Sequence, residues 1–139
     1  MKVLQWNADS FLSKKEEFRE VIKEKDIDIF LIQETKMIAT DKAPNFPGYT
    51  ILNKPRKQPA GKEKNRGGGL LIGIRNTIPY RDIKNNNLRD KDDGITEWQT
   101  IEIPISQKEK WRITNVYIPS ERAGDVRGSQ NETVLSTRL

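Results

Sequence analysis

The hydrophobic pattern near the N-terminus predicts a strand, a helix and a second strand. Residues 2–8 mix apolar and polar positions, residues 14–25 carry apolar positions at helical spacing, and residues 27–33 form a nearly unbroken apolar run. The apolar positions of the predicted helix are Phe18, Val21 and Ile22. A strand, a helix and a strand joined by short connections usually place the two strands parallel and close together.

The junction before this helix has the spacing of a capping box. Ser13 stands just before the predicted first turn, and Glu16 follows three residues later. We therefore expect the Ser13 hydroxyl to accept a hydrogen bond from the Glu16 amide, and the Glu16 side chain to reach back to Ser13.

The rest of the pattern predicts further strands and a hairpin. Residues 48–52 form a short apolar stretch after a proline-marked loop, and residues 97–105 and 111–118 are joined as a hairpin by residues 106–110. The residues expected to share a face are Ile101, Ile103 and Ile105 in one hairpin strand, and Trp111, Ile113, Asn115 and Tyr117 in the other. With the N-terminal unit, these elements predict an α/β fold with mixed strand directions.

Three glycines at residues 67–69 precede an apolar run that ends at Arg75. They stand before a strand rather than between a strand and a helix, and their spacing fits neither the dinucleotide fingerprint nor the P-loop. We interpret them as the entry to a buried strand, at a point where two backbone segments approach closely.

The pattern weakens in two places. Residues 85–94 are acidic and contain turn-forming residues, but their spacing does not match a calcium-binding loop, so we interpret them as a turn. After Pro119 the chain is polar, without clear apolar periodicity. We expect residues 1–120 to form the domain and residues 121–139 to be a disordered polar tail with no regular element.

Two polar side chains stand where the first two predicted strands end. Asn7 lies near the end of the first strand, and Glu34 comes directly after the buried second strand. The carboxyl ends of parallel strands meet at one edge of a sheet, where sites are commonly built in α/β proteins. Asn7 and Glu34 are therefore the first candidates for a functional site.

The composition limits the chemistry of such a site. The 139 residues include no cysteine and no histidine, which excludes disulfides, thiolate metal sites and catalysis by imidazole. Carboxylates, amides, hydroxyls, Lys and Arg remain. The lack of cysteine fits an intracellular or compartment-neutral protein, and no apolar run is long enough for a signal peptide or a membrane span.

The positive charge of the chain is concentrated in residues 54–66. This basic segment carries six basic residues and one acidic residue, a net charge of +5 that equals the net charge of the whole chain. The basic residues are Lys54, Arg56, Lys57, Lys62, Lys64 and Arg66. A concentrated basic segment favours contact with nucleic acid, and a solvated surface loop is the other interpretation.

Several motifs occur together in the order of one known family. They are Trp6-Asn7, Ile32-Gln33-Glu34-Thr35-Lys36, Gly67-Gly68-Gly69-Leu70-Leu71-Ile72 and Asn115-Val116-Tyr117-Ile118-Pro119. In this set the chain resembles the endonuclease/exonuclease/phosphatase superfamily, most closely the apurinic-endonuclease-like domain of non-LTR retrotransposons. The resemblance covers residues 1 to about 120.

The resemblance implies a four-layer α/β sandwich, of which this chain would be the N-terminal half. It implies an endonuclease that nicks DNA with Mg²⁺ or Mn²⁺. By this resemblance Glu34 would bind the metal, Asn7 would help to hold the metal site and the phosphate, and Tyr117 would contact the phosphate. These three residues are the candidate catalytic residues. The implied partners are DNA, the remaining half of the domain or a reverse transcriptase domain, and the implied location is the nucleus.

The chain also departs from the family pattern. The family's Asn-x-Asn-Gly reads Asn7-Ala8-Asp9-Ser10 here, and neither a Gly-Asp-Phe-Asn motif nor a terminal Ser-Asp-His motif occurs. We therefore expect a truncated domain without nuclease turnover of its own, with one sheet face lacking its partner. Two alternatives are a non-catalytic remnant that binds nucleic acid through the basic segment, and a phosphoesterase acting on small molecules.

Overall fold

The computed structural model describes residues 1–56, 68–84 and 96–118, and the backbone course of residues 130–138. The expected acidic turn at 85–94 and most of the basic segment lie outside the described residues. No helix in the described part is long and apolar enough to cross a membrane.

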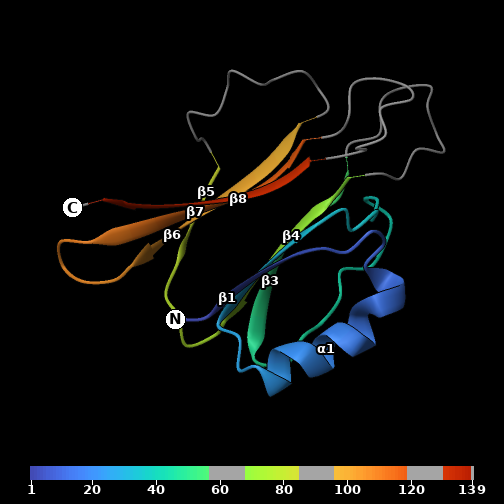
Figure 1. Ribbon diagram of the computed structural model, residues 1–139, viewed down its shortest axis with the longest axis horizontal. Coiled ribbons are helices and arrows are strands. Elements are labelled where there is room, and N and C mark those ends of the chain that lie inside the picture. Colours follow the sequence, from blue (N-terminus) through green and yellow to red (C-terminus); the bar gives the residue numbers. More distant parts are fainter. Residues whose placement is uncertain (57–67, 85–95, 119–129, 139) are drawn as a thin grey trace.

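The described elements form three layers, with a helix below one sheet and a second sheet above it (Figure 1). The first sheet has the strand order β1-β2-β4-β3 and the second has the order β5-β6-β7-β8. The strands of the first sheet are β1 (Val3–Asn7), β2 (Ile29–Gln33), β3 (Tyr49–Lys54) and β4 (Leu70–Arg75). The strands of the second are β5 (Arg81–Ile83), β6 (Glu97–Pro104), β7 (Lys110–Ile118) and β8 (Gln130–Arg138). The predicted α/β class with mixed strand directions is confirmed.

The N-terminal unit folds as its periodicity predicts. β1 and β2 are parallel neighbours, with Asn7 opposite Gln33, so both strands end at the same edge of the sheet. Between them lie a short 3-10 turn (Leu12–Lys14) and helix α1 (Lys15–Glu24). The predicted capping box is wrong, because the helix begins after Lys14 and has no side-chain capping hydrogen bond. Glu16 instead pairs with Arg19, one turn later, at 2.6 Å.

Aromatic side chains fill the space between α1 and the first sheet. Phe30 on β2 contacts Phe18, Phe46 and Tyr49, with ring centroids 5.1–5.5 Å apart. Buried aromatic pairs of this kind contribute about 0.5–1.5 kcal/mol each beyond the area that they bury. This aromatic core holds the helix on the outer face of the first sheet.

Isoleucine and leucine side chains fill the space between the two sheets. The layer comprises Ile29, Leu31, Ile72, Ile74, Ile101, Ile103 and Ile113, all fully buried or nearly so. The run on β2 is therefore buried on both faces, as its composition predicts. Of the three isoleucines expected on one face of β6, Ile101 and Ile103 lie in this layer, whereas Ile105 follows the strand and is 41% exposed.

The second sheet corrects two expectations. One sheet face was expected to lack its partner, but the inner faces of the two sheets cover each other. Residues 121–139 were expected to contain no regular element, yet β8 pairs with β7 from Gln130 to Arg138. β5 was not predicted either. β5 and β8 are held by backbone hydrogen bonds to a neighbouring strand. A polar sequence can form such bonds without an apolar pattern of its own.

Asp28 joins three strands at the end of the sandwich opposite to the candidate site. Its carboxylate accepts the Lys2 backbone N–H at 2.7 Å and the Arg75 Nε–H at 3.1 Å. The hydrogen bond from Lys2, supported by Arg75, lowers the pKa of Asp28 below its ordinary value. The ionised carboxylate therefore stabilises the folded state.

Because the folded-state pKa is lowered, this stabilisation is present above the pKa of an unfolded aspartate and is lost as the pH falls through the folded-state value. We expect the free energy of unfolding to decrease as the pH is lowered below about 4. In Asp28→Asn this decrease should be smaller, since the amide does not titrate there. Urea denaturation at a series of pH values tests this, and equal slopes in both proteins would contradict it.

Candidate functional site

The two strand ends at the edge of the first sheet are held together beyond their last paired residues. Ala8 donates to the Gln33 carbonyl at 2.9 Å, Ser10 to the Glu34 carbonyl at 2.9 Å and Phe11 to the Thr35 carbonyl at 3.0 Å. Residues 8–11 and 33–35 therefore run side by side out of the sheet. This places Asn7 and Glu34 at one edge, as the parallel pairing predicts.

Glu34 receives a hydrogen bond from the second sheet. The Tyr117 hydroxyl donates to Glu34 Oε1 at 3.2 Å, although the two residues are 83 positions apart. Tyr117 is 7% exposed, whereas Glu34 is half-buried. The structure thus brings two of the three predicted site residues into contact.

Asn7 lies at the same edge of the sheet and shapes the turn that follows β1. Its side-chain oxygen accepts the Asp9 backbone N–H at 3.1 Å, which is the geometry of an Asx turn. Asp9 and Ser10 have φ values of 46° and 85°. An amide oxygen has a second lone pair, so this contact leaves Asn7 able to bind another group.

The backbone at Glu34 adopts an uncommon conformation. Its φ is 51°, and that of Lys36 is 57°, in the left-handed region that non-glycine residues rarely occupy. Such a conformation costs about 1–2 kcal/mol and persists where neighbouring contacts impose it. The contacts come from the entry to β4: Thr35 donates to the Gly69 carbonyl at 3.1 Å and Lys36 to the Gly68 carbonyl at 2.8 Å.

The two glycines allow this close approach. Gly69 has a φ of 91°, and a Cβ atom placed on it would lie 2.2 Å from Thr35 Oγ1. The sequence-based interpretation of residues 67–69 as a close backbone approach is confirmed for Gly68 and Gly69; Gly67 lies outside the described residues. We call Gly68 and Gly69 the glycine turn.

An ion pair next to Glu34 was missed by the sequence analysis. Lys36 Nζ lies 2.6 Å from Asp9 Oδ1, so it links the two strand-end segments. The hydrogen bond to Asp9 raises the pKa of Lys36, and the charges of Asp9 and Glu34 add to the effect. The same hydrogen bond lowers the pKa of Asp9. Both residues lie in sequence motifs named above, Lys36 after the second strand and Asp9 after the first. Only the fold shows that their side chains meet.

A buried amide network connects the two sheets behind the site. Gln33 donates to Asn115 Oδ1 at 2.6 Å, and the Asn115 amide donates to the carbonyls of Ile32 at 3.0 Å and Leu71 at 3.3 Å. Gln33 and Asn115 are both fully buried. Because unpaired buried amides are costly, this network favours one register of β7 over the first sheet. That register places Tyr117, two residues further along β7, over Glu34.

The structure describes two of the residues that are predicted to contact nucleic acid. Lys54 at the end of β3 donates to the Trp98 carbonyl at 2.6 Å, with Nζ 6.0 Å from the centre of the indole ring. Arg56 lies near Met37, to whose carbonyl its backbone N–H donates at 2.9 Å. Lys57, Lys62, Lys64 and Arg66 lie outside the described residues, so the nucleic-acid contacts stay predictions.

The donors at the strand ends suit a hard divalent cation. They are oxygen atoms of a carboxylate, an amide and a phenol, and Glu34 is only half-buried. Within the described ranges, no three acidic side chains come close enough to form a metal cluster. Mg²⁺ often binds through one or two carboxylates and retains several waters, so Glu34 with Asn7 fits this kind of site.

A two-sheet α/β sandwich with oxygen donors at its strand ends defines an architecture that can serve several activities. The chain matches the endonuclease/exonuclease/phosphatase family over residues 4–128. The protein belongs to this family, a superfamily of phosphodiesterases and nucleases whose members generally depend on a divalent metal ion. No characterised protein matches the chain in a sequence comparison.

Proposed function

We propose that this chain carries the Glu34 side of a metal-dependent DNA endonuclease site, from the apurinic-endonuclease-like domain of a retrotransposon. The observation that supports it best is the contact of Glu34 with Tyr117 at the edge where β1 and β2 end. The family membership supports the reaction class. DNA as the substrate, Mg²⁺ or Mn²⁺ as the ion and a nuclear location all belong to this proposal.

Each residue has a role that its contacts allow. Glu34 Oε1 accepts the hydrogen bond from Tyr117, so Oε2 is the oxygen that Glu34 can offer to a cation. Asn7, at the same edge of the sheet, can add its amide oxygen. Tyr117 orients the Glu34 carboxylate and presents its phenol toward a phosphate. A bound divalent ion would supply positive charge to neutralise the phosphate during attack by water. The ion pair of Lys36 with Asp9 lies at the same edge and ties the segments after β1 and β2 together.

We further propose that the 139-residue chain does not cleave DNA by itself. It has no histidine to act as a general base, and the acidic and amide motifs that the family places later in the domain do not occur in it. The C-terminal half of the family's domain, or a reverse transcriptase domain, would be the natural partner. The second candidate function is nucleic-acid binding through the basic segment, which the net charge of +5 in residues 54–66 favours.

Metal binding at Glu34 is tested by titrating Mn²⁺ and following the free ion by electron paramagnetic resonance. We expect Glu34→Gln to weaken Mn²⁺ binding by about tenfold or more, because an amide oxygen carries no net charge. Glu20→Gln, which removes an exposed carboxylate from α1, is the matched control and should bind as the unaltered protein does. Equal affinities for all three proteins would refute the metal site.

A plasmid-nicking assay with Mg²⁺ tests the proposed DNA cleavage site, the proposed inactivity of the chain and the nucleic-acid-binding alternative. No nicking is expected from the unaltered chain. Nicking that disappears in Glu34→Gln would support the endonuclease site and overturn the proposed inactivity. DNA retention that falls steeply with salt, without cleavage and without dependence on Glu34, would favour the nucleic-acid-binding alternative.

A further inference from the structure

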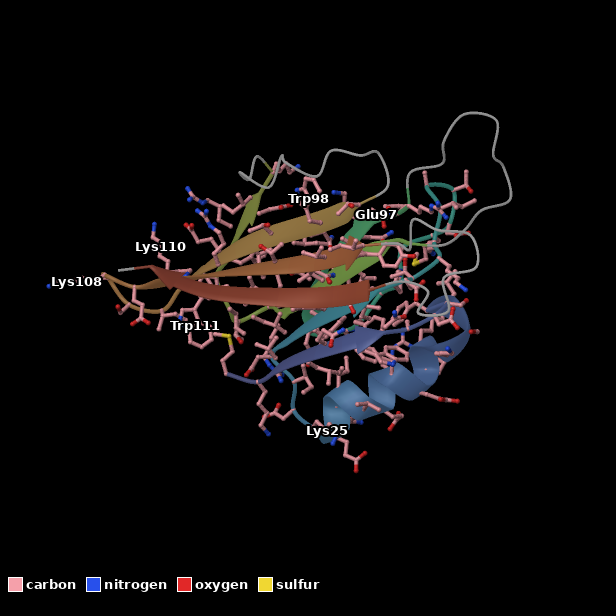
Figure 2. All side chains as sticks on the ribbon, turned by 45° about the horizontal axis from the view of Figure 1, so that its top comes forward. Lys25, Glu97, Trp98, Lys108, Lys110 and Trp111 are labelled. Atoms are coloured by element: carbon pink, nitrogen blue, oxygen red, sulfur yellow. The ribbon has the colours of Figure 1, made fainter. Side chains whose placement is uncertain are left out.

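Glu97 is a buried carboxylate at the start of β6, and the roles proposed above do not use it. It is 6% exposed, and its Oε1 accepts the Gly69 backbone N–H at 2.7 Å. Figure 2 shows Glu97 at the end of the sandwich away from Lys108 and Lys110. A carboxylate is rarely buried unless it is hydrogen-bonded, so this contact calls for a structural or functional reason.

The glycine turn packs against Glu97 and Tyr117 together. A Cβ atom on Gly68 would lie 2.8 Å from Glu97 Oε1 and 3.4 Å from Tyr117 Cε2. Glu97 and Tyr117 are directly opposite each other on β6 and β7, with their side chains on the face that meets the first sheet. The turn therefore lies against the same two side chains of the second sheet, one of which reaches Glu34.

The glycine turn also connects Glu97 to the backbone around Glu34. The Gly69 N–H donates to Glu97. The Gly69 and Gly68 carbonyls accept hydrogen bonds from the N–H groups of Thr35 and Lys36, in that order. Those two residues immediately follow Glu34, whose left-handed backbone needs external support. A displaced turn would release both hydrogen bonds and allow Glu34 to relax.

We propose that Glu97 is a positioning residue: through the glycine turn it fixes the backbone around Glu34 and so aims the Glu34 carboxylate. The functional consequence of this inference rests on the proposed role of Glu34 as a metal ligand. The hydrogen bond needs an acceptor oxygen at the length of a glutamate side chain. Glutamine keeps such an oxygen, aspartate is too short by one methylene, and alanine has none.

Amide hydrogen exchange measured by NMR tests the positioning directly in the full chain. We expect exchange at Gly69, Thr35 and Lys36 to become about tenfold faster or more in Glu97→Ala, with Leu31 in the core of β2 unchanged. Glu97→Gln should stay within about threefold of the unaltered protein at all four amides. If Glu97→Ala does not fold, Glu97→Asp replaces it with the same expectation.

Mn²⁺ affinity provides the second measurement. Glu97→Ala should bind Mn²⁺ about tenfold more weakly, with recovery in Glu97→Gln, because removal of a group that supports a metal ligand usually lowers metal affinity by about 10–100-fold. Glu20→Ala on α1 is the control and should leave both measurements unchanged.

The outcomes separate the two proposals. If only Gly69 exchanges faster while Thr35 and Lys36 do not, or if Glu97→Gln behaves as Glu97→Ala does, the positioning role is wrong. If the unaltered protein binds no Mn²⁺, the metal site of the proposed function fails, and the exchange rates still decide whether Glu97 positions the Glu34 backbone.

Discussion

Replacing Phe30 by alanine is expected to lower the free energy of unfolding by about 3–5 kcal/mol, the range found for large aromatic side chains in cores. Phe30 is fully buried, and its ring contacts Phe18, Phe46 and Tyr49. Its ring also covers Gly73, where a Cβ atom would lie 2.0 Å from Phe30 Cζ. Neighbours packed this tightly cannot collapse into the space left by the ring. Urea denaturation followed by circular dichroism measures the loss.

Two further variants make this prediction specific. Ile105→Ala removes a side chain that is 41% exposed, and it should change the free energy of unfolding by no more than about 0.5 kcal/mol. Gly73→Ala should destabilise strongly alone but add little to Phe30→Ala, because the added methyl then enters the space that the ring occupied. Additive effects of the two substitutions would show that Phe30 does not lie over Gly73.

Gly69→Ala is expected to lower the free energy of unfolding by about 2–4 kcal/mol, through two separate costs. The first is the φ of 91°, which an alanine adopts only with strain. The second is the approach of the new Cβ to Thr35 Oγ1, at 2.2 Å. Relief of that clash would move Thr35, the residue after Glu34, so Mn²⁺ affinity should fall along with stability.

Gly48→Ala is the matched control for this substitution. Gly48 has a similar φ of 88°, but a Cβ atom there would meet nothing within 4 Å. It should therefore show the backbone cost alone, about 1 kcal/mol, with unchanged Mn²⁺ affinity. Equal destabilisation by the two substitutions would mean that the contact with Thr35 contributes nothing.

The elements that the sequence predicts well are those with an apolar pattern of their own. The buried run of β2, the helical spacing of Phe18 and Ile22, and the alternation in β6 and β7 all correspond to observed elements. β5 and β8 were missed because a strand at the edge of a sheet can be held by backbone pairing to its neighbour. The capping box failed because a preceding 3-10 turn moved the helix start past Ser13.

The candidate site was predictable in part. Parallel pairing of β1 and β2 follows from their connection through α1, and it alone brings Asn7 and Glu34 to one edge. Their catalytic roles, and that of Tyr117, stay predictions that the metal and nicking experiments address. The Asp9–Lys36 pair and the contact of Glu97 with the glycine turn were not predicted, because each depends on how two separate segments pack.

The sequence by itself determined the strand, helix and strand unit and the polar ends of its two strands, because periodicity and short connections act over a few residues. It also determined the absence of imidazole and thiolate chemistry, which follows from composition alone. The tertiary structure decided that Tyr117 meets Glu34, and that Glu97 holds the turn against which the Glu34 segment rests. These contacts cross from one sheet to the other, and their geometry depends on the register set by the core and by the Gln33–Asn115 amide bond.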